Sequence, residues 1–81
     1  MAQERTTTST ATLIMTRLIQ LGVAWVLLPE GRRVSVLRLG NGTWQYTLDA
    51  ITYSGFAESG EAISDLTNRL ANEGILLRFQ I

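Results

Sequence analysis

The chain has 81 residues, of which seven are basic and seven acidic, and it contains neither cysteine nor histidine. A chain of this length forms one small domain whose single hydrophobic core is barely sufficient for stability. Without cysteine, neither a disulfide nor a thiolate metal site supplements that core. The zero net charge gives no reason to expect a polyanionic partner, and an apolar content of 46% is typical of a folded chain.

Residues 12–29, TLIMTRLIQLGVAWVLLP, are apolar enough to raise the question of a membrane span. Arg17 and Gln20 interrupt the stretch, and a charge at the centre of a bilayer carries a large energetic penalty. No small-residue cleavage pattern follows, so a secretory signal is not predicted either. We therefore expect a soluble, cytoplasmic protein with a flexible polar tail over residues 1–9 and a single domain over residues 10–81.

The first predicted element is an amphipathic helix over residues 11–21. Its polar residues fall along one side at helical spacing and its apolar residues along the other, and Gly22 is placed to end it. Only Leu13 projects from the polar side. Together with Ile14 and Leu18, Leu13 forms the surface that we expect to mediate self-association.

Three strands are predicted next, over residues 23–28, 33–39 and 43–48, because each run is rich in branched or aromatic side chains and is bounded by turn residues. The first of them is apolar on both faces, which is typical of a strand that is central or covered on both sides. The third alternates cleanly between apolar and polar residues.

The two turns between these strands carry distinct signals. Pro29 suits the second position of a type I turn, and Gly31 suits a left-handed residue that closes a hairpin. Asn41 and Gly42 both tolerate the positive φ of a type I′ turn, so a two-residue hairpin turn is predicted at these positions.

Residues 49–56 read either as a short fourth strand or as an extended crossover. Ser59 is a helix-capping residue type, and apolar residues at helical spacing predict a helix over residues 60–73 that Gly74 ends. Alternating residues 75–81 predict a final strand. The predicted fold is a small α+β domain, with an antiparallel sheet of four or five strands and two helices, in the order α-β-β-β-(β)-α-β.

The sequence is poor in catalytic chemistry. The commonest general base and metal ligand, histidine, is missing, and the serines and threonines have neither a histidine nor a lysine to activate them. No glycine-rich stretch matches a phosphate-binding loop. Glu61 and Asp65 are four residues apart and could act as an acid–base pair, but Arg69 one turn later favours an exposed ladder of charges. We therefore predict no enzyme activity, no metal and no cofactor.

Charged residues suggest two candidate surfaces for a partner. Arg32 and Arg33, with Arg38, lie on the first hairpin and are either a solvated strand face or an anchor for a carboxylate of another protein. An acidic group lies at the start of the last helix and consists of Glu58, Glu61 and Asp65. Because the two groups have opposite sign, docking to a complementary protein surface is expected to weaken with salt.

The aromatic residues divide into two groups. Trp25 and Phe79 lie in apolar runs, which favours a place in the core. Trp44 and Tyr46 lie on a strand with a polar opposite face, and two helices can leave part of the sheet uncovered. We therefore treat Trp44 and Tyr46 as candidate partner-binding residues.

The predicted function is that of a non-catalytic protein-binding module: an adaptor, a regulatory subunit or an inhibitor that pairs with itself. Two amphipathic helices and a strand with two apolar faces offer more apolar surface than one small domain buries, and a symmetric dimer is the commonest way to cover it. One alternative is an inhibitor that a phage or mobile element encodes and that acts on a protein of the host. Another is a nucleic-acid-associated protein that uses Arg32, Arg33 and Arg38, although the neutral chain makes nucleic acid an unfavoured partner.

Overall fold

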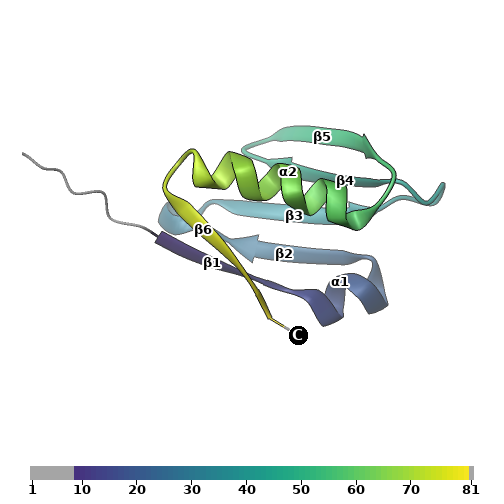
Figure 1. The fold of residues 1–81 in the computed structure, drawn as a ribbon, viewed down its shortest axis with the longest axis horizontal. Helices are drawn as coiled ribbons and strands as arrows, with labels where there is room; N and C mark the ends of the chain where they lie inside the picture. Colours follow the sequence, from purple (N-terminus) through teal and green to yellow (C-terminus); the bar gives the residue numbers. More distant parts are fainter. Residues whose placement is uncertain (1–8, 81) are drawn as a thin grey trace, which may run out of the picture.

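The computed structural model describes residues 9–80, and these form an α+β domain, as predicted (Figure 1). In chain order the elements are β1 (Ser9–Ile14), α1 (Met15–Leu21), β2 (Val23–Leu27), a 3₁₀ turn η1 (Pro29–Gly31), β3 (Arg33–Arg38), β4 (Trp44–Leu48), β5 (Ile51–Phe56), α2 (Ser59–Ala71) and β6 (Ile75–Gln80). The flexible tail that we predict falls on residues outside this range, except for Ser9, which begins β1.

Strands β2 to β5 form an antiparallel sheet in the order β2-β3-β4-β5, while β1 and β6 form a separate parallel pair. Helix α2 lies across one face of the four-stranded sheet and contacts β4 and β5 (Figure 1). The hydrophobic core lies under this helix. Its largest fully buried side chains are Tyr46, Leu13, Leu18, Leu66, Leu70, Val26, Val34 and Val36.

The N-terminal helix is much shorter than predicted. Residues 9–14 form β1, which pairs in parallel with β6, so that Leu13 lies beside Phe79. The helix begins only at Met15 and ends at Gly22, whose φ of 71° and N–H bond to the Leu18 carbonyl oxygen (2.9 Å) form the predicted C-terminal cap. Pairing with a partner strand 66 residues away in the chain overrides the helical pattern of residues 11–14.

The turns set the register of the sheet. Gly31 has the expected positive φ (76°), but Glu30 adopts one too (65°), so the turn is not type I. The second hairpin turns over three residues rather than two, because the Gly42 N–H donates to the Leu39 carbonyl and the Leu39 N–H to the Thr43 carbonyl. Gly42 alone of this loop has positive φ (87°), which corrects the predicted type I′ turn at Asn41 and Gly42.

Residues 49–56 resolve into a turn and a fourth antiparallel strand. Asp49 and Ala50 both have positive φ, 53° and 67°, and join Leu48 to Ile51 by the two-residue turn type that requires this conformation at both positions. Strand β5 follows and pairs with β4 through a bulge at Gly55, whose φ is 87°. The crossover alternative is therefore wrong.

Helix α2 spans Ser59–Ala71, close to the predicted range of residues 60–73, but its N-terminus lacks the predicted serine cap. It starts at Ser59, after Glu58 in the capping position, and no side chain caps it there. The Glu61 carboxylate instead accepts the N–H of Ala57 at 3.0 Å, just before the helix. Within residues 9–80, no helix is long and apolar enough to cross a membrane.

Strand β2 is covered on one face only, which contradicts the prediction that both of its faces are buried. Ala24 and Val26 are in the core, but Trp25 is 57% exposed and Leu27 is 71% exposed. Phe79 on β6 is also exposed rather than buried. The helices therefore leave an apolar part of the sheet uncovered.

Candidate functional site

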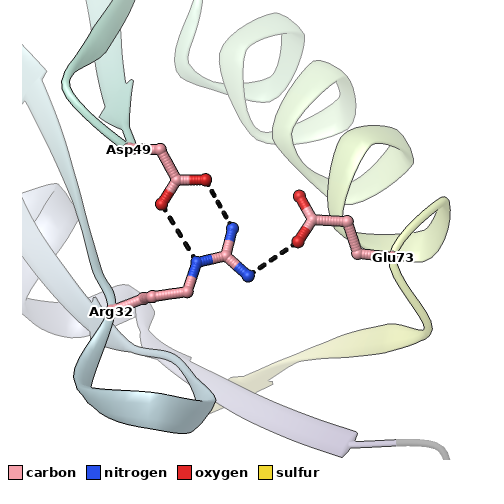
Figure 2. A network of polar contacts seen from close by, with 3 residues as sticks. All are labelled: Arg32, Asp49 and Glu73. Carbon is pink, nitrogen blue, oxygen red and sulfur yellow. Dashed lines mark hydrogen bonds and ion pairs between the residues drawn. The ribbon is translucent and has the colours of Figure 1, made fainter.

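Arg32 ties three segments of the chain together at one end of the sheet (Figure 2). Its Nε and one terminal nitrogen donate to the two carboxylate oxygens of Asp49, at 3.0 and 2.6 Å. Its other terminal nitrogen donates to Glu73 at 2.7 Å. Asp49 lies in the β4–β5 turn and Glu73 follows α2, so the guanidinium joins the start of β3 to both. These hydrogen bonds lower the pKa of the Asp49 carboxyl and raise that of Arg32.

The predicted arginine patch is not a single surface. Arg32 is engaged with carboxylates of its own chain. Arg33 lies opposite Leu27 on the uncovered face of the sheet, while Arg38 lies at the far end of β3, where its side chain packs over Gly22. Arg32 is therefore a structural residue. Arg33 and Arg38 lie apart from Arg32 and apart from each other, so the three arginines do not form one surface.

A second polar cluster joins α2 to the sheet beneath it. The Tyr46 hydroxyl donates to Asp65, and Arg69 Nε donates to the Tyr46 oxygen at 2.7 Å and to Asp65 at 3.1 Å. The Arg69 guanidinium lies 3.8 Å from the centre of the Tyr53 ring, a cation–π geometry. The ring centroids of Tyr53 and Phe56 lie 5.0 and 5.9 Å from that of Tyr46. Tyr46 is fully buried, so it belongs to the core and not to a partner-binding surface.

The environment of this cluster raises the pKa of Tyr46 and lowers that of Asp65. Burial raises the pKa of Tyr46, and the hydrogen bond to Asp65 raises it further. The same hydrogen bond and the charge of Arg69 lower the pKa of Asp65. The cluster therefore holds a neutral phenol against an ionised carboxylate, which is the arrangement of a structural hydrogen bond. The Asp65–Arg69 ion pair is the part of the predicted charge ladder that forms.

The acidic group that the sequence singles out lines a shallow hollow of about 500 Å³ beside the start of α2. Glu58, Glu61 and Asp65 all contribute to its wall, together with Phe56. Two of the three carboxylates already have partners in the chain, because Glu61 accepts the Ala57 N–H and Asp65 binds Tyr46 and Arg69. Within residues 9–80, no three histidine, cysteine or carboxylate side chains lie close enough to hold a metal ion.

The uncovered face of the antiparallel sheet, called the open face below, is a surface whose residues, apart from Arg33, the sequence reasoning did not single out. Because side chains on one face recur every second residue, the register places one set of them together. These residues are Val23, Trp25, Leu27, Arg33, Ser35, Leu37, Gln45, Thr47 and Thr52.

Within the open face, the apolar residues form a stripe at its β2 edge. Val23, Trp25 and Leu27 follow one another along β2, and Leu37 is the strand partner of Val23. The half of the face over β4 and β5 is polar and uncharged, and there the hydroxyls of Thr47 and Thr52 lie 2.9 Å apart. The open face thus combines an apolar stripe with a neutral polar area.

Two of the three residues predicted to mediate self-association are inside the molecule. Leu13 and Leu18 are 0% and 1% exposed, and Ile14 is half-buried. Trp44 likewise packs against the core beside Tyr46. The buried leucines present no surface to a second copy, so a self-interface has to use other residues.

Comparisons with known protein families, with curated proteins and with solved structures found no match. The assignment of a function therefore depends on the geometry described above.

Proposed function

We propose that the protein is a non-catalytic protein-binding module that pairs with a second copy of itself through the open face. The observation that carries the proposal is the exposed apolar stripe of Trp25, Leu27 and Leu37 on a sheet face that no helix covers. Contiguous apolar surface of this kind is characteristic of interaction sites. A sheet face of this type is normally buried against another layer.

The charge on the open face favours a second copy as the occupant. Among its paired positions in the described strands, Arg33 is the one charged residue and it lies at the edge, beside the β2–β3 turn. Two copies can therefore stack with little electrostatic repulsion, whereas the face offers little with which to select a strongly charged partner. Stacking of two such faces forms a sandwich with a helix layer on each outer side.

Single-cysteine cross-linking tests this proposal, and the natural absence of cysteine makes the design clean. Ser35→Cys places a thiol in the middle of the open face, because Ser35 is the strand partner of both Trp25 and Thr47. Thr10→Cys is the matched control on β1, at an exposed position outside the four-stranded sheet. With a short bis-maleimide at low protein concentration, we expect cross-linked dimer from Ser35→Cys and little from Thr10→Cys. Equal yields from both variants, or none from either, would contradict the proposal.

A further inference from the structure

A hollow of about 240 Å³ lies between the C-terminal end of α2 and the β4–β5 turn, on the side of the sheet opposite to the open face. Its chemistry differs from that of the open face because Arg69, Asn72 and Glu73 line it together with apolar residues. Ligand binding in this hollow does not depend on the proposed self-association.

Arg69 is held in place before any ligand arrives. Its Nε is shared between Tyr46 and Asp65, and its guanidinium lies over the Tyr53 ring. Its two terminal nitrogens donate to no residue in the described part of the chain. A guanidinium fixed in this way loses little conformational entropy when it binds a carboxylate through two parallel hydrogen bonds.

Glu73 provides an acceptor on the same hollow. One of its oxygens binds Arg32, and the second, which points away from Arg32 in Figure 2, has no hydrogen-bond or ion-pair partner among residues 9–80. Arg69 lies in the last turn of α2 and Glu73 in the turn that follows the helix, and the two side chains form no ion pair with each other. A donor and an acceptor thus border the same hollow without binding each other.

Apart from Asp49 and Asn72, the remaining lining of the hollow is apolar or aromatic, and the local charge is nearly balanced. Leu48, Ile51 and Tyr53 line it, and Ile51 is 55% exposed. The two arginines and three carboxylates around it, Arg32, Arg69, Asp49, Asp65 and Glu73, leave one net negative charge. That balance disfavours a doubly charged anion such as phosphate and suits a ligand with its own positive group.

We propose that this hollow binds a small zwitterion, an α-amino acid with an aliphatic side chain. Its carboxylate accepts hydrogen bonds from the terminal nitrogens of Arg69, its ammonium donates to the free oxygen of Glu73, and its side chain packs on Ile51. An open hollow of this size supports a dissociation constant on the order of 1–10 mM.

A titration of the ¹⁵N-labelled chain, followed by amide chemical shifts, tests the assignment. The probes are L-leucine, 4-methylpentanoate (the same skeleton without the ammonium), 3-methylbutylamine (the same side chain without the carboxylate) and inorganic phosphate. We expect saturable shifts with leucine near Ile51, Arg69 and Asn72, binding at least about fivefold weaker for each single-ended analogue, and no saturation with phosphate. Absence of saturation with leucine, or equal binding of leucine and 4-methylpentanoate, would overturn the proposal.

Two variants separate this site from non-specific binding. Arg69→Gln removes the guanidinium that donates to the carboxylate of the ligand, so leucine should no longer shift the amide resonances. Arg33→Gln, on the other side of the sheet, should leave these chemical-shift changes intact. Glu73→Gln should remove the preference for leucine over 4-methylpentanoate, and this variant carries the test if Arg69→Gln fails to fold. Leucine shifts that persist unchanged in folded Arg69→Gln, or an unchanged preference in Glu73→Gln, would refute the site.

Discussion

Single residues in this small domain join distant segments of the chain through polar contacts. These contacts cannot be predicted from the amino-acid composition. Arg32 reads in the sequence as one member of a basic pair, but it bridges carboxylates 17 and 41 residues away. Its partners were not predictable because Asp49 and Glu73 reach it only through the β4–β5 turn and the end of α2. Asp65 and Arg69 were predictable, since their spacing of four residues is local.

The Arg32–Asp49 contact predicts a specific pH dependence. The pKa of Asp49 in the folded state lies below its ordinary value of 3.8, so the carboxylate contributes stability above that pH and loses its contribution as pH falls through the lowered pKa. Arg32→Gln should therefore be less stable than wild type at neutral pH, and the difference should shrink below about pH 4. Urea unfolding from about pH 7 to about pH 2 measures this.

Arg33→Gln is the matched control for that series, because Arg33 lies on the opposite face and has no carboxylate partner among the described residues. Its difference from wild type should stay flat with pH. A difference for Arg32→Gln that is equally flat would show that the contact with Asp49 does not stabilise the fold.

Ala50 is a second residue with a measurable consequence. Its φ of 67° lies in the left-handed region, which costs a residue with a Cβ roughly 1–2 kcal/mol and costs glycine almost nothing. Glycine loses more backbone entropy on folding than alanine, which offsets part of this gain. Ala50→Gly should therefore raise the free energy of unfolding in urea by about 0.5–1 kcal/mol. Ala57→Gly, at an exposed position without positive φ, should show no gain. A loss of stability in Ala50→Gly would contradict this turn geometry.

At the scale of the elements, the turns decide which face of each strand is inside. With the three-residue loop at Gly40 to Gly42, Tyr46 pairs with Val36 and faces the core. The predicted two-residue turn would shift the register by one residue and place Tyr46 opposite Leu37, on the open face. Tyr46 was treated as a candidate partner-binding residue because two helices can leave part of the sheet uncovered, but the observed register places it on the covered face.

The exposure of Trp25 also follows from the register that a turn sets, and the sequence contains the pattern that predicts it. Valines at positions 34 and 36 and a serine at position 35 indicate which face of β3 is buried. The three-residue loop from Pro29 to Gly31 then pairs Trp25 with Ser35, on the other face. Apolar content alone could not make this choice, because both faces of β2 are apolar.

The replacement of the predicted helix over residues 11–14 by β1 has its own test. Leu13 is fully buried against the core, so Leu13→Ala should destabilise the fold by about 2–4 kcal/mol. Leu21→Ala, at a residue that is 67% exposed on α1, should cost less than about 0.5 kcal/mol. Equal small effects in denaturant unfolding would place Leu13 on the surface, as the helical interpretation has it.

At the scale of the whole molecule, the α+β class, the second helix and most strands were predictable because their periodicity is local. The parallel pairing of β1 with β6 was not, since it joins the two ends of the domain. The surplus of apolar surface was predictable from the number of apolar faces on the predicted elements. Its location was not, because it depends on the register of β2 and on the single face that α2 covers.

The open face is proposed to be covered by the same face of a second copy, and a measurement of solution mass tests this most directly. Light scattering across a dilution series should give wild type a mass of twice the chain at high concentration. Trp25→Glu, which places a charge in the middle of the apolar stripe, should remain at the mass of one chain throughout. Leu76→Glu, at a similarly exposed residue on β6, should behave as wild type. A wild type that is monomeric at every concentration, or a Trp25→Glu variant that still dimerises, would contradict the account.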